Sequence, residues 1–147
     1  MTLAEVIRRI EAVASSQPAV NTIVRSDVFR LNTLPSVRYG VFAWTQGQHS
    51  TSIDSDFITF NFSLFYVARL TEDRGNETEV QSVGISTIDN IIRTLDDEGI
   101  EAGSYTFTTF NQRFADDCAG VFTGVSFSVP VSLVCEETFE DREVAYE

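Results

Sequence analysis

Carboxylates are the side chains in this sequence best suited to chemistry, since 22 of its 147 residues are Asp or Glu. General acid–base catalysis needs two of them in a cleft with separated pKa values. The carboxylates that lie close together in the sequence instead fall in segments predicted to be loops or helix ends. The pair Asp116 and Asp117 also lacks the regular oxygen spacing of a calcium-binding loop. We therefore expect no catalytic residue and no metal site. The groups are Asp54 with Asp56, Asp96 with Asp97 and Glu98, and Asp116 with Asp117.

Nucleophilic catalysis would have to recruit His49, the single histidine. It stands in the polar run Gly-Gln-His-Ser-Thr, which offers nothing to orient an imidazole, so we expect a surface histidine. Cys118 and Cys135 have no C-x-x-C partner and cannot complete a zinc site with one histidine. We expect both as small hydrophobic residues in or near strands. The ten basic residues include no lysine, which a phosphate-binding P-loop requires. The sequence thus predicts a protein that is not an enzyme and holds no cofactor.

The composition narrows the class of protein. A net charge of −12 opposes the phosphate neutralisation on which nucleic-acid binding depends. Aromatic side chains could stack on the bases of a single-stranded nucleic acid. The candidates alternate along the chain as core residues do, and they are Trp44, Phe60, Phe62, Phe65 and Tyr66. We expect neither a signal peptide nor a membrane span, because no basic segment precedes an apolar block and no apolar run approaches about 18 residues.

Two helices must position these side chains. The first follows a Thr2/Glu5 capping box and ends near Ser15 or Ser16, before Pro18. The second follows Asn76, for which the same capping is expected, and ends at Gly99 in a C-terminal cap. Acidic residues at that end oppose the helix dipole, a cost that an arginine or a neighbouring subunit could offset.

Strands are predicted from alternating apolar residues. The longest runs from 57 to 70 and pairs as a hairpin with residues 37–44, around the polar loop 45–56. Shorter strands are expected at 22–25, 28–31 and 105–110, and residues 111–120 read as a polar loop. A final strand, 121–135, carries Pro130, which places it at a sheet edge or bends it.

These elements predict an α+β fold in which two amphipathic helices pack on one side of a mainly antiparallel sheet of about four to six strands. Residues 1–135 form a single domain, and residues 136–147 form an acidic tail. The predicted core is Leu3, Val6, Ile7, Ile10, Ile58, Phe60, Phe62, Leu64, Ile88, Ile91, Ile92, Leu95, Val125 and Phe127.

The segment Tyr66-Val-Ala-Arg-Leu-Thr-Glu-Asp-Arg-Gly-Asn-Glu-Thr-Glu-Val-Gln-Ser82 leads into Ile91-Ile-Arg-Thr-Leu95. With the N-terminal helix, this arrangement resembles the tail-terminator or tail-completion proteins of long-tailed bacteriophages and related head–tail neck proteins. The resemblance implies a virion protein, assembled in the cytoplasm of the bacterial host, that forms a ring, usually a hexamer. Such a ring ends the tail tube and joins it to the head. An acidic lumen would let DNA pass without binding it.

The polar loop and the acidic tail are better explained by contacts to a neighbouring subunit or ring than by an isolated monomer. The candidate contact positions are Trp44, Gln46, His49, Asp54, Asp56, Glu136, Glu137 and Glu140. Two alternatives stay open. One is a small acidic ligand-binding or enzymatic domain of a bacterium, and the other is a tail-tube, stopper or other neck protein.

Overall fold

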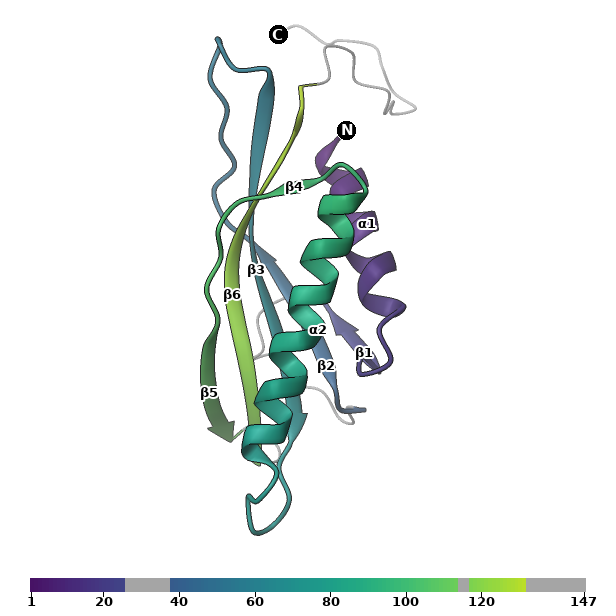
Figure 1. The fold of residues 1–147 in the computed structure, drawn as a ribbon, viewed down its shortest axis with the longest axis vertical. Coiled ribbons are helices and arrows are strands. Elements are labelled where there is room, and N and C mark those ends of the chain that lie inside the picture. Colours follow the sequence, from purple (N-terminus) through teal and green to yellow (C-terminus); the bar gives the residue numbers. More distant parts are fainter. Residues whose placement is uncertain (26–37, 114–116, 132–147) are drawn as a thin grey trace, which may run out of the picture.

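The computed structural model describes residues 1–25, 38–113 and 117–131. Within them lies a six-stranded, mostly antiparallel sheet in the order β1-β2-β3-β6-β4, with β5 also paired to β6. Both helices pack along one face of this sheet (Figure 1), which confirms the predicted α+β fold. The elements are α1 (Leu3–Ser15), β1 (Thr22–Val24), β2 (Val41–Gln46), β3 (Phe57–Arg69), α2 (Glu77–Asp97), β4 (Glu101–Ala102), β5 (Thr108–Arg113) and β6 (Asp117–Pro130).

The start of α1 is capped as predicted, because the Thr2 hydroxyl accepts the Glu5 backbone N–H at 3.2 Å. The capping prediction for Asn76 is wrong. Its side chain makes no capping bond to α2; it accepts the Thr71 N–H at 2.9 Å and donates to the Arg69 carbonyl at 3.2 Å. The Asn76 amide therefore closes the loop before the helix.

The end of α2 confirms the predicted glycine cap. Gly99 has φ +93°, and the N–H groups of Gly99 and Ile100 donate to the carbonyls of Asp96 and Leu95 at 3.1 and 3.0 Å. This is the Schellman arrangement, for which glycine is preferred. The arginine expected to offset the acidic C-terminal end of α2 is Arg9 of α1, whose Nη1 lies 3.2 Å from Glu98 Oε2.

The long hairpin is also confirmed, since β2 and β3 are antiparallel from Val41↔Val67 to Gln46↔Phe62. The last strand is predicted to lie at an edge or to bend at Pro130, and the edge position is wrong for the strand as a whole. The strand β6 lies between β3 on one side and β4 and β5 on the other, and Pro130 is its last residue. Pairing with β4 extends no further along β6 than Ser128, so the missing Pro130 N–H costs that ladder nothing.

The polar segment 111–120 is not simply a loop. Strand β5 covers Thr108–Arg113 in place of 105–110, and its pairing with β6 reaches Arg113↔Asp117. The predicted strand at 22–25 is present as β1, whereas the predicted strand at 28–31 lies outside the described residues.

The predicted core forms between the helices and the sheet. Leu3, Ile7 and Ile58 are half-buried against it, and the other predicted members are buried. The helix α2 approaches the sheet closely at Gly84, where an added Cβ would lie 3.0 Å from Tyr66 Cδ1 and Val121 Cγ2. A residue that weakens the helix in isolation thus permits helix–sheet contact.

The opposite face of the sheet carries a smaller apolar cluster of Val24, Val41, Ala43, Val67 and Cys118. Cys118 is 1% exposed, as expected for a small hydrophobic residue, and Cys135 lies outside the described residues. Across the parts of the chain that the structure describes, neither helix has the length and apolarity needed to span a bilayer.

Candidate contact surface: the hairpin arm

The β2–β3 hairpin extends past the ends of both helices (Figure 1). We call its residues 46–61 the arm. Strand β6 pairs with the β3 part of the arm, with register Phe57↔Pro130 to Asn61↔Ser126, and the Val131 N–H donates to the Asp56 carbonyl at 2.9 Å. The arm is therefore an ordered extension of the sheet, not a free loop.

The tip of the arm is a turn closed by the Ser55 N–H, which donates to the Ser52 carbonyl at 3.0 Å. Ile53 occupies this turn and is 100% exposed. Phe57 and Val131 beside the turn are 44% and 38% exposed. Next to them is a hollow of about 550 Å³, lined by Thr51, Ser52, Ile53, Ser55, Asp56, Ile58 and Val131.

His49 is held firmly, contrary to the sequence-based expectation. Its Nδ1 accepts the Asn61 backbone N–H at 3.1 Å, and its Nε2 lies 2.9 Å from Gln46 Oε1. The ring also packs edge-on against Phe60, with centroids 5.2 Å apart, and lies tilted against Phe62, with centroids 5.8 Å apart. Two of the predicted contact positions, Gln46 and His49, are thus joined in one cluster that fixes the course of the arm.

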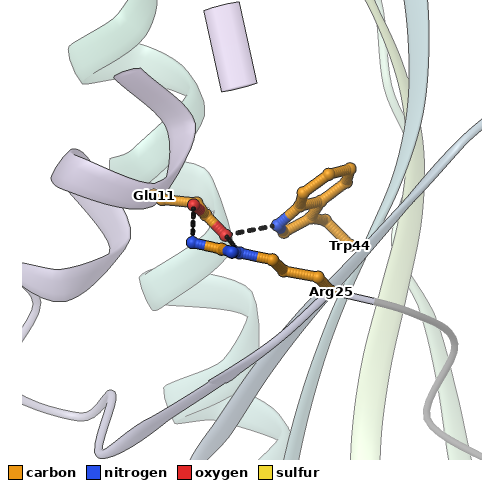
Figure 2. A network of polar contacts seen from close by, with 3 residues as sticks. All are labelled: Glu11, Arg25 and Trp44. Atoms are coloured by element: carbon orange, nitrogen blue, oxygen red, sulfur yellow. Dashed lines mark hydrogen bonds and ion pairs between the residues drawn. The ribbon is translucent and has the colours of Figure 1, made fainter. Parts of the chain in front are cut away.

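Trp44 is 7% exposed and belongs to the core of the subunit rather than to its surface. Its Nε1–H donates to Glu11 Oε2 at 3.0 Å. The same carboxylate accepts two bonds from Arg25, from Nε at 2.7 Å and from Nη2 at 3.0 Å. Figure 2 shows this network, which ties α1 to the base of the hairpin. Trp44 therefore supports the arm from within.

The ionisation of Glu11 reflects these contacts. Burial opposes its charge, but the hydrogen bonds from Arg25 and Trp44 and the guanidinium charge outweigh burial and lower the pKa of the Glu11 carboxyl. A lowered folded-state pKa contributes stability above the unfolded-state pKa, and that stability is lost as pH falls through the folded value. Acidification should therefore loosen the link between α1 and the sheet.

Replacing Glu11 with alanine should lower the free energy of unfolding by about 1–3 kcal/mol, because the buried Trp44 N–H loses its acceptor. Urea titration at neutral pH measures the loss. The matched control is a double-mutant cycle with Trp44→Phe, which removes the donor. An equal cost of Glu11→Ala in both backgrounds would show that the Trp44 bond contributes nothing.

The remaining predicted acidic positions do not converge. Asp54 and Asp56 are exposed at the arm tip, and Asp96 uses Oδ1 to accept the Ala102 N–H at 3.1 Å. Asp117 begins β6, while Asp116, Glu136, Glu137 and Glu140 lie outside the described residues. Within residues 1–25, 38–113 and 117–131, no group of three His, Cys, Asp or Glu side chains could hold a metal ion.

Sequence reasoning missed one polar cluster. Asp89 accepts from the Tyr105 hydroxyl at 2.5 Å and from Arg93 Nε at 2.8 Å, and the Tyr105 bond is the main reason why the pKa of Asp89 is lowered. A hollow of about 370 Å³ adjoins it, lined by Ile92, Arg93, Asp96, Asp97, Ala102 and Tyr105. The spacing of Asp89 and Arg93 on one helix face was the available signal.

Neither the protein-family models nor the curated proteins compared with this chain give a match.

Proposed function

We propose that this chain is a structural virion protein of a long-tailed bacteriophage. It forms a ring, hexameric as in the proteins it resembles, that ends the tail tube and joins it to the head–neck region. The sequence resemblance through residues 66–82 and 91–95 supports this proposal, and so does the α+β fold that the resemblance implies.

The arm is the observation that carries the proposal. An ordered extension backed by β6 presents the fully exposed Ile53 beyond the helices. Burying one such side chain stabilises a protein contact by roughly 1.5–3 kcal/mol. Within its own subunit Ile53 is fully exposed and does not contribute this free energy. A neighbouring subunit or an adjoining ring would supply that burial, and a ring repeats the contact at every subunit.

The negative net charge of the chain is consistent with a ring through which DNA passes. With a net charge of −12 per chain, a ring would repel phosphates and avoid the counterion-release affinity that would hold DNA in the lumen. The proposed partners are therefore copies of this chain, the tail tube and the neck proteins.

A second candidate function is a small bacterial ligand-binding or enzymatic domain. The hollow beside Asp89 and Tyr105 favours it, because its volume of about 370 Å³ is within the size range of small-molecule sites. A monomer that binds a small molecule there would support this reading over the ring.

Size-exclusion chromatography with light scattering tests the proposal, together with sedimentation onto purified tail tubes. A discrete ring that binds tubes is the expected result for a terminator. A ring without tube binding would indicate a stopper or another neck protein.

Replacing Ile53 with serine should weaken assembly about tenfold or more while leaving the subunit folded, because the exposed tip loses its apolar side chain. Val83→Ser is the matched control, since Val83 is 43% exposed but lies on α2. Dissociation constants from light-scattering dilution series give the measurement. Weakening by Val83→Ser alone would place the contact on the helix instead of the arm.

A further inference from the structure

The arm contains a bulge that a side chain closes. The Gly47 N–H donates to the Asn61 carbonyl at 2.8 Å, and Ser50 and Thr59 exchange bonds of 2.9 and 2.8 Å. Two residues separate Gly47 from Ser50, but only Phe60 separates Asn61 from Thr59. One strand therefore has an extra residue, and a bulge of this kind interrupts the regular ladder.

The His49 side chain supplies the hydrogen-bond acceptor that is missing where the ladder is interrupted. The Asn61 N–H donates to His49 Nδ1 at 3.1 Å, in the place where a ladder would supply a carbonyl oxygen. An imidazole nitrogen that accepts a hydrogen bond carries no proton, so the proton of the neutral ring is on Nε2. From there it is donated to Gln46 Oε1, 2.9 Å away.

A second proton on the ring removes this acceptor. Both nitrogens of an imidazolium are donors, so Nδ1–H would face the Asn61 N–H, and neither would have an acceptor. Among the described residues, the groups that hydrogen-bond to the ring or pack on it as rings are Gln46, Asn61, Phe60 and Phe62, all uncharged. Within the described residues, no carboxylate is paired with His49, while Asp54 and Asp56 lie further along the hairpin at its tip.

We propose that His49 is a proton-operated latch for the arm. The neutral imidazole closes the bulge and fixes residues 46–50, the outer strand of the arm, against β3. Protonation of the ring turns Nδ1 into a donor, which opens the ladder at Asn61 and frees that strand. The phenyl rings still hold the imidazolium, so the release is local. The inference concerns the folded subunit alone and stands whether or not the chain forms a ring.

Two variants, compared with the wild-type protein, separate the acceptor, the charge and the packing of His49. Wild-type protein has all three. His49→Asn keeps an oxygen acceptor near the position of Nδ1, but its side-chain amide takes up no proton. His49→Phe keeps a ring against Phe60 and Phe62 but has no acceptor.

Amide hydrogen exchange followed by NMR provides the test, with protection factors corrected for the intrinsic pH dependence of exchange. Because His49 is the single histidine, its imidazole signals report titration and tautomer without ambiguity. Leu64, central in β3, is the internal control amide.

Between pH 7.5 and pH 5, the protection factor of the wild-type Asn61 amide should fall about tenfold or more, in step with His49 titration. It should stay constant in His49→Asn and be low at both pH values in His49→Phe. Leu64 should remain protected throughout. Constant Asn61 protection through the wild-type titration would overturn the latch, as would an equal fall in His49→Asn.

Discussion

Replacing Phe62 with alanine is expected to lower the free energy of unfolding by about 3–5 kcal/mol. Phe62 is 2% exposed, and its ring centroid lies 6.0 Å from those of both Trp44 and Phe127. Truncation therefore removes aromatic contacts and leaves a cavity between two strands and the helix layer. Urea denaturation followed by circular dichroism measures the change.

Phe57→Ala is the matched control, because Phe57 lies on the same strand and is 44% exposed. Its truncation should cost well under half as much, as is usual for residues near the surface. Equal shifts of the two midpoints would show that burial along β3 does not set the cost.

Assembly of the proposed ring should strengthen markedly when salt is raised from 0.1 to 1 M. Each chain carries a net charge of −12, so neighbouring subunits of such a ring would repel one another. The Debye length falls from about 10 Å to about 3 Å over this range, which screens the repulsion. Light scattering at equal protein concentration gives the measurement.

An arm-shortened variant tests the geometry behind that expectation. Deleting residues 45–56 would cut into β2, where Thr45 and Gln46 pair with Ser63 and Phe62. A change that leaves β2 intact and removes only the first two residues of β3 replaces residues 51–58 with Asn-Gly, a two-residue turn suited to joining the paired Ser50 and Thr59. We expect a folded monomer at both salt concentrations. The terminator proposal fails if the unaltered protein also stays monomeric at both concentrations and does not bind tail tubes.

Local patterns explain which elements could be predicted. Residues 58–70 alternate because one face of β3 meets the helices and the core, and Gly99 marks a backbone conformation that other residues adopt at a cost. The hairpin and both helices are visible from such signals. The central position of β6 is not, since Pro130 restricts only its own N–H and the sequence does not say where β4 stops pairing.

The arm illustrates the same limit. The polar run around His49 predicts a loop, but its order comes from Asn61 and Phe60, which lie more than ten positions further along the chain. Asn76 has the residue type of a helix cap, yet a nearby loop competes for its side chain. In both cases the partner that a side chain adopts in the folded structure decides its role, and residue spacing does not encode that choice.

The unbroken β3–β6 ladder also has a mechanical consequence. All 13 residues of β3 pair with β6, from Phe57 at the arm to Arg69 beside the start of α2. A force applied to the tip along the strand direction loads the hydrogen bonds between β3 and β6 in shear. Many of these bonds then bear the force together, instead of breaking one after another. The arm should therefore behave as a stiff lever that transmits force to the far end of the subunit.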